Sequence, residues 1–228
     1  MKKYFLFLSS FCFALSSFGQ QSKIEIASNP LLSASNYLAY PVPVKKLTPA
    51  PEGYKPFYIS HYGRHGSRYL IGRRDYDRPY QVLLHADSLG KLTSKGKDVL
   101  RKLSVVRSEA LGRDGELTLL GALQHKGIAK RMYQNFPEVF SGHVRVDAKS
   151  TVVIRCILSM ENALQQLLVL NPDLDIRHDA SYHDMYYMNQ SDKALERLRK
   201  SDDVKHLYKS FVISHSHFGH LMRVLFND

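Results

Sequence analysis

Residues 57–68 read FYISHYGRHGSR. The first three, Phe57-Tyr58-Ile59, are a β-prone run bounded by a proline and a glycine, and they predict a short strand. An arginine-rich turn follows, and ligands of α/β proteins bind where the chain leaves the carboxyl end of a strand. Arg64 and Arg68 are four residues apart, so both would lie on one face if the turn winds into a helix.

The residue types of this turn suit phosphate. An arginine guanidinium matches two phosphate oxygens at once, and the N-terminus of a helix adds N–H donors. His65 lies between the two arginines, where an unprotonated ring nitrogen is a competent nucleophile at phosphorus. Gly66 lets the backbone approach a ligand closely. A basic surface loop would produce the same string, so the turn alone leaves both interpretations open.

Outward from this turn, helical and strand patterns alternate and predict an α/β fold. The helical patterns cover Val82–Leu111 (with a break near Gly90–Gly96), Thr118–Phe136, Val152–Leu170 and Lys193–Asp228. A strand pattern covers Val144–Ala148. Polar or proline-rich stretches predict an extended segment over 20–56 and loops over 72–80 and 173–191.

Arg155 stands near the start of the apolar helix predicted over 152–170. A buried arginine needs an anionic partner, which a bound phosphate would supply. The alternative is a salt bridge to an acidic side chain such as Glu161 or Asp147.

Composition narrows the class of protein. The chain has 228 residues, 44% hydrophobic and 23% charged, which excludes a disordered or collagen-like chain. Two cysteines exclude a disulfide-rich fold and a cysteine-based zinc framework. The formal net charge of +11 favours an anionic partner: nucleic acid, an anionic surface or a phosphorylated small molecule.

The first 19 residues have the pattern of a signal peptide. Lys2 and Lys3 precede an apolar, serine-rich run, and Ser17 and Gly19 are small residues at the −3 and −1 positions of a cleavage site. The alternative is a buried N-terminal helix. We therefore expect an exported protein (periplasmic, secreted or surface-associated), which argues against nucleic acid as the partner. No later apolar stretch approaches the roughly 18 residues of a membrane span.

Three segments resemble the histidine acid phosphatases, a branch of the histidine phosphatase superfamily. The first is residues 61–68, here named the signature loop; the family continues to a proline where this chain has Leu70. Leu117–Gln124 resembles the family's Leu-Thr-x-x-Gly-x-x-Gln helix start, and Lys149–Arg155 resembles the segment that delivers a third phosphate-binding arginine. The string His183–Asn189 is most similar to the multiple inositol polyphosphate phosphatase branch.

The resemblance implies a histidine phosphatase-like central sheet flanked by helices. It also implies phosphomonoester hydrolysis through a phosphohistidine, on inositol polyphosphates or 2,3-bisphosphoglycerate, without a metal or other cofactor. In this scheme His65 is the nucleophile, and Arg64, Arg68 and Arg155 hold the phosphate.

The family takes its general acid from a late His-Asp or His-Ala-Glu motif, and we find no match. His178-Asp179 and His183-Asp184 have the letters of the first motif but lie too early. We therefore expect that the general acid is not present in this chain and that the C-terminal part of the fold is missing. The domain over 57–228 would then be incomplete, with about 173–228 in a helical subdomain.

Other features leave alternatives open. Arg73 and Arg74 are candidates for contacts to distal phosphates of a polyanion, or are part of a solvated loop. The histidines at 215–220 lack the nearby carboxylates or cysteines of a metal site. A non-catalytic polyanion-binding protein would keep the phosphate site without the acid. A phosphoglycerate mutase-like transferase fits poorly with export.

Overall fold

The structure is a computed structural model that describes residues 21–40, 46–188 and 192–227. The predicted signal peptide over 1–19 lies outside the described residues. The chain divides into two compact units, Met1–Lys46 and Leu47–Asp228. In the first unit, residues 21–28 form a helix, followed by the 3-10 turns η1 (Pro30–Ser33) and η2 (Ser35–Tyr37).

The prediction of an extended segment from residue 20 was therefore wrong for this part of the first unit. Residues 21–28 precede the first proline, so nothing in them opposes a helix. Pro30 itself occupies the first position of η1, where a missing N–H costs nothing.

In the second unit, helix α2 (Arg73–Ser88) packs against α3 (Ser94–Glu109), with Gly90 at a φ of +69° in the turn between them. The helices expected over 82–111, with their break near Gly90, are confirmed. The loop predicted over 72–80 was wrong, because α2 begins at Arg73 and passes through Pro79. Burial of Tyr76 and Leu83 stabilises this helix beyond what its local sequence predicts.

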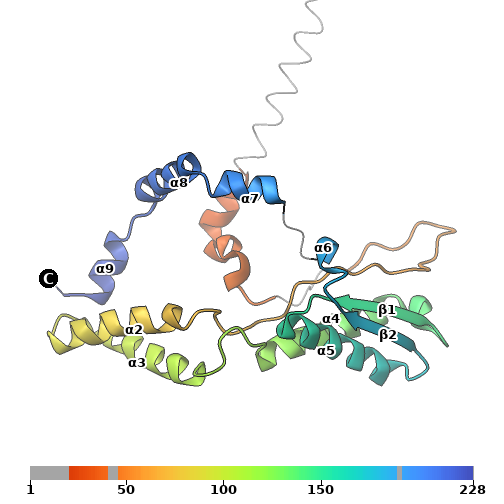
Figure 1. The fold of residues 1–228 in the computed structure, drawn as a ribbon. Helices are drawn as coiled ribbons and strands as arrows, with labels where there is room; N and C mark the ends of the chain where they lie inside the picture. Colours follow the sequence, from red (N-terminus) through yellow and green to blue (C-terminus); the bar gives the residue numbers. More distant parts are fainter. Residues whose placement is uncertain (1–20, 41–45, 189–191, 228) are drawn as a thin grey trace, which may run out of the picture. The chain divides into compact units, whose positions relative to one another are not determined.

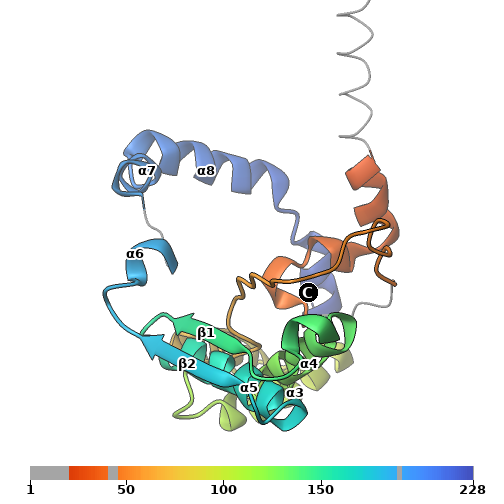
Figure 2. The same cartoon turned by 90° about the vertical axis from the view of Figure 1, so that its right-hand side faces the viewer.

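A strand–helix–strand unit, together with a helix that precedes it, supports the signature loop. Strand β1 (Arg145–Ser150) pairs in parallel with β2 (Asp175–Ala180), and α5 (Ile154–Leu170) is the crossover between them. Helix α4 (Leu119–Asn135) and the 3-10 turn η3 (Pro137–Phe140) precede β1. Figures 1 and 2 show α4 and α5 beside this pair of strands.

The main hydrophobic core lies between α4, α5, η3 and one face of the strands. Its buried members are Ala129, Phe140, Leu167 and Leu174, and the half-buried residues packed on them include Ile59, Val146 and Ile176. The helices predicted over 118–136 and 152–170 and the strand over 144–148 are confirmed.

The predicted central sheet was wrong in extent: the described residues form a mostly helical structure with one two-stranded parallel sheet. Phe57-Tyr58-Ile59 forms no strand, and Phe57 is 92% exposed. The loop predicted over 173–191 instead contains β2. Its only large apolar residue is Ile176, so backbone pairing with β1, rather than an apolar pattern, defines this strand.

Four helices follow β2 in the part of the chain that the structure describes: α6 (Met185–Met188), α7 (Lys193–Arg199), α8 (Asp202–His215) and α9 (Gly219–Leu225). The helical pattern predicted over 193–228 is thus divided into three, since the Ser201 hydroxyl caps a new helix, α8, and the extended backbone of Ser216 ends it before α9 begins. Within the described ranges, we find no helix with the length and hydropathy needed to cross a membrane.

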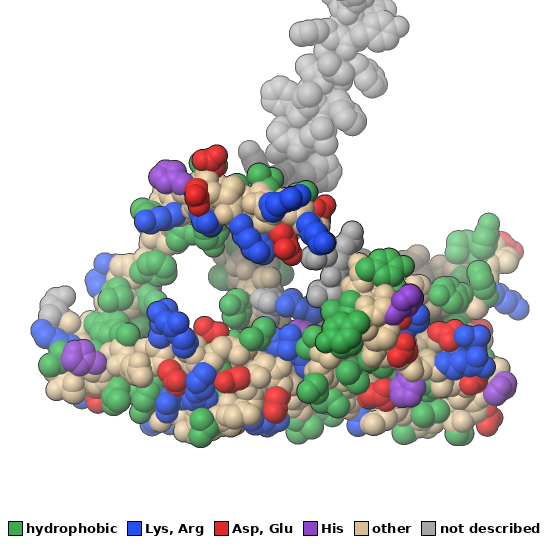
Figure 3. Space-filling view, in the orientation of Figure 1, with side chains coloured by type: hydrophobic (Ala, Val, Ile, Leu, Met, Phe, Trp, Pro, Cys, Tyr) green, Lys and Arg blue, Asp and Glu red, His purple; other side chains and the backbone are tan. Residues whose placement is uncertain are grey.

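The surface is mixed in character. On the face shown in Figure 3, basic and acidic side chains are interspersed, and hydrophobic side chains lie among them. Exposed hydrophobic residues of the second unit include Leu119 on α4, Ile154 on α5 and Tyr208 on α8.

Candidate active site

The signature loop has no helical turn. Residues 61–66 are irregular, and Arg68 forms an isolated antiparallel bridge with Leu117. The conditional prediction that Arg64 and Arg68 share a helix face was therefore wrong, and the phosphate-binding geometry must come from the partners of the loop.

The start of α4 holds the backbone of the loop at Ser67. The N–H and the hydroxyl of Thr118 both donate to the carbonyl oxygen of Ser67, each at 2.9 Å. The Ser67 N–H donates to Oε1 of Gln124 at 2.8 Å. Thr118 also caps α4 by accepting from the N–H of Gly121 at 3.1 Å. Two motifs quoted from the sequence, 61–68 and 117–124, therefore meet through hydrogen bonds.

The same contact brings two glycines together. A Cβ on Gly66 would lie 2.6 Å from the Cα of Gly121 and would also meet its carbonyl oxygen. Only glycine fits where these backbones cross, which gives Gly66 a packing role in addition to any approach to a ligand.

His125 also holds the signature loop, a role that the sequence did not predict. Its side chain lies buried on α4, and Nε2–H donates to the carbonyl oxygen of Arg64 at 3.1 Å. Burial lowers the pKa of His125, and the hydrogen bond to the Arg64 carbonyl opposes this shift. Its position directly after the quoted Leu117–Gln124 segment was the available signal.

His65 is held in a defined tautomer. Its Nδ1 lies 2.8 Å from the carbonyl oxygen of Gly66, which can only accept, so Nδ1 carries the proton and Nε2 keeps its lone pair. Burial lowers the pKa of His65, and the hydrogen bond to Gly66 opposes this shift. The charges of Arg155, Arg64 and Arg68 also lower this pKa. These influences favour a neutral imidazole, on which the charges of all three arginines act.

None of these three arginines forms an ion pair with a carboxylate of the described residues. Arg68 donates to the carbonyl oxygen of Tyr69 at 2.8 Å, and Arg155 donates to that of Gly115 at 3.4 Å. Nε of Arg68 and Nε of Arg155 are buried and have no hydrogen-bond partner among the described residues. Positively charged donors that are buried and lack a carboxylate partner favour the binding of an anion.

The salt-bridge alternative for Arg155 does not hold in the structure, because both candidate acids have other partners. Glu161 pairs with His178 at 2.6 Å, and Asp147 pairs with Arg145 at 2.8 Å.

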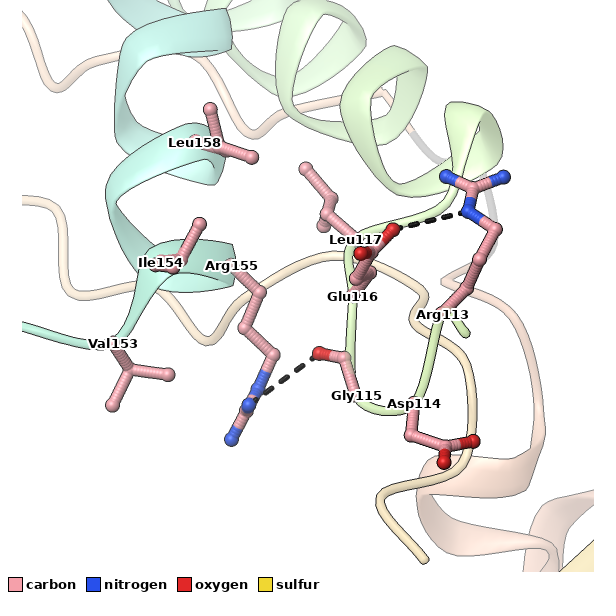
Figure 4. A pocket seen from close by; sticks show the side chains of 9 residues that line it. All are labelled: Arg113, Asp114, Gly115, Glu116, Leu117, Val153, Ile154, Arg155 and Leu158. Carbon is pink, nitrogen blue, oxygen red and sulfur yellow. Dashed lines mark hydrogen bonds and ion pairs between the residues drawn. The ribbon is translucent and has the colours of Figure 1, made fainter. Parts of the chain in front are cut away.

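An open cavity of about 480 Å³ lies beside Arg155. Figure 4 shows Arg155 between the start of α5 and the loop over 113–117, with Ile154 and Leu158 on the helix side. The lining includes Arg155 but not His65, so this cavity adjoins the arginine–histidine cluster rather than containing it.

Arg73 and Arg74 differ in their surroundings. Nε of Arg73 lies 3.3 Å from Oδ1 of Asp77, and Nη2 of Arg73 donates to the carbonyl oxygen of Arg107. Arg74 is exposed on α2. Arg73 therefore has structural partners, whereas Arg74 is accessible.

The two early His-Asp pairs do not provide an obvious proton donor. Asp184 is buried and lies 2.9 Å from Nζ of Lys149, which lowers the pKa of this carboxyl group and keeps it ionised. Asp179 is exposed on β2.

A hydrogen bond from Tyr62 to the carbonyl oxygen of Met188, at 2.8 Å, ties α6 to the signature loop. We find no group of three or more His, Cys, Asp or Glu side chains suited to a metal ion among the residues described.

No protein-family model matches this chain, and no curated protein matches it. The apo crystal structure of multiple inositol polyphosphate phosphatase from Bifidobacterium longum is similar, with 27% identity and a TM-score of 0.50. This match covers 59% of the present chain and 29% of that structure, so the present chain spans less than a third of its length.

Structures of the same enzyme with inositol hexasulfate and with phosphate match at 28% and 27% identity, with TM-scores of 0.44 and 0.45. Each covers 56% of this chain and 26% of the matched one. The similarity to the apo structure confirms, over the part it covers, the predicted resemblance of this chain to the multiple inositol polyphosphate phosphatases among the histidine acid phosphatases.

Proposed function

We propose that this chain carries the nucleophilic and phosphate-binding part of a phosphomonoesterase that acts through a phosphohistidine at His65. The observation that carries the proposal is a neutral His65 ring, with its lone pair on Nε2, under the influence of three arginines without carboxylate partners among the described residues.

In the proposed reaction, the Nε2 lone pair of His65 forms a bond to phosphorus as the bond to the ester oxygen breaks. Arg64, Arg68 and Arg155 stabilise the negative charge on the three equatorial oxygens. The leaving oxygen takes a proton from solvent or from an acid. Water then attacks the phosphohistidine, releases phosphate and restores the neutral ring.

Inositol polyphosphates are the proposed substrates. The proposal is supported by the similarity to multiple inositol polyphosphate phosphatase and by the basic balance of the chain, with a net charge of +11. Accessible Arg74 is a candidate for a distal phosphate.

A second candidate, binding of polyanions without turnover, is supported by the state of Asp184. Because Lys149 keeps Asp184 ionised, this carboxyl group is a poor proton donor to an alkoxide. Aryl phosphates separate the candidates, since a phenolate leaves without a proton whereas an inositol alkoxide does not.

The test compares the unmodified chain with His65→Ala and, as a control, with a variant of the exposed His206 (His206→Ala). We expect the first and last to release 4-nitrophenol from 4-nitrophenyl phosphate, and His65→Ala to lose roughly 10³-fold or more in rate. Equal rates for all three would refute the role of His65. Binding of inositol hexakisphosphate without release of phosphate from any ester would favour the second candidate.

A further inference from the structure

Ser159 connects the two segments that carry the arginine–histidine cluster. It lies in the second turn of α5 and is 3% exposed. Its hydroxyl donates to the carbonyl oxygen of Arg155 at 2.8 Å and accepts from the N–H of Gly66 at 3.1 Å. The second bond joins positions 93 residues apart in the sequence.

A hydroxyl has one hydrogen and two lone pairs. Because the hydrogen of Ser159 is committed to the preceding turn of α5, the rotation of the hydroxyl is fixed and a lone pair points at the loop. A serine that bonds only to its own helix would leave the Gly66 N–H without this acceptor.

The residue that Ser159 holds is the one that orients the nucleophile. Gly66 receives the Nδ1–H of His65 on its carbonyl oxygen and donates its N–H to Ser159. Hydrogen bonds to both polar groups of Gly66, joined by its covalent backbone, therefore link Arg155 and Ser159 to the ring of His65. Among the neighbouring charges, that of Arg155 acts most strongly on this ring.

We propose that Ser159 is a positioning residue that sets where the imidazole of His65 stands relative to the guanidinium of Arg155. The inference rests on the proposed function for its catalytic meaning, but the geometry it describes exists without turnover. A small displacement of the imidazole or the guanidinium would weaken phosphate binding and slow phosphoryl transfer, because both groups must contact the same phosphate.

The test is Ser159→Ala in the intact chain, with Ser159→Thr as the conservative rescue. Ser214→Ala is the matched control, since Ser214 also donates to the carbonyl oxygen four residues before it but has no bond to the signature loop. Three quantities are measured: the affinity for inorganic phosphate, the rate of phosphohistidine formation, and the pKa of His65 by NMR, assigned with His65→Ala.

We expect Ser159→Ala to bind phosphate roughly tenfold to a hundredfold more weakly and to form phosphohistidine correspondingly more slowly. We also expect an upward shift of the His65 pKa as Arg155 and the ring separate. Ser159→Thr should recover most of each change, and Ser214→Ala should show none.

A folded Ser159→Ala with the parent's phosphate affinity and His65 pKa would overturn the proposal. If Ser159→Ala does not fold, Ser159→Cys is compared in its place, because it keeps the volume but is a weak acceptor. If the unmodified chain forms no phosphohistidine, the proposed function fails, whereas the His65 pKa still decides the role of Ser159.

Discussion

Burial has the largest effect on the pKa of His65, and among the neighbouring charges that of Arg155 acts on this ring most strongly. Arg155→Ala removes that charge, so we expect the His65 pKa to rise toward 6.5 and phosphate to bind with roughly 1.5–3 kcal/mol less free energy. Arg155→Lys keeps the charge but loses the planar fork, so the pKa should stay low while binding still weakens. NMR titration and calorimetry with inorganic phosphate measure the two effects. An unchanged His65 pKa and phosphate affinity in Arg155→Ala would contradict the arrangement.

Between elements, the contact that matters is the crossing of the signature loop over the start of α4. A Cβ on Gly121 would lie 2.9 Å from the backbone nitrogen of Ser67 and 2.7 Å from Cδ1 of Leu117. We expect Gly121→Ala to lower the free energy of unfolding by about 1–3 kcal/mol, because overpacking outweighs the gain in helix propensity.

Gly127 on the same helix is the matched control. The nearest atom to a Cβ there is the end of the Arg131 side chain, at 3.2 Å, rather than a backbone atom. Gly127→Ala should leave stability unchanged or raise it by up to about 1 kcal/mol. Urea unfolding measures both variants, and equal effects at the two positions would show that the crossing is not tight.

The elements also show what a sequence can predict. Helices α4 and α5 have long apolar periodicity and clear caps or stops, and both were predicted nearly to their ends. Strand β2 and the first turns of α2 were missed, because they depend on pairing with β1 and on burial of Tyr76, which are not local. In the site, the sequence singled out the arginines and His65, whose roles stay predictions. Ser159 and His125 were not identified, because their roles consist of hydrogen bonds to backbone groups distant in the chain.

For the whole molecule, the titration of His65 and His125 predicts how stability depends on pH. Both have a folded-state pKa below the ordinary value of 6.5, so the unfolded chain binds more protons as the pH falls below 6.5. The free energy of unfolding should therefore decrease between pH 7.5 and pH 5. Asp77, Asp98 and Asp184 have lowered pKa values, that of Asp98 being about 2, so a further loss should follow below about pH 3.8.

Urea unfolding at pH 7.5, 6, 5 and 3 measures this profile. His125→Gln keeps an N–H donor for the Arg64 carbonyl but cannot titrate, so it should reduce only the loss between pH 7.5 and 5. A free energy of unfolding that stays constant or rises over this range would contradict the lowered pKa values assigned to half-buried His65 and buried His125.

The central claim is that His65 accepts a phosphoryl group, and trapping that group on the protein tests it most directly. The chain is mixed with 4-nitrophenyl phosphate for a short time, denatured in alkali, in which phosphohistidine survives, and digested for mass spectrometry. The account predicts one added phosphoryl group, on the peptide that contains His65, and its loss in His65→Ala. A chain that cleaves the ester with no phosphoryl group on His65, or with the group on another residue, would contradict it.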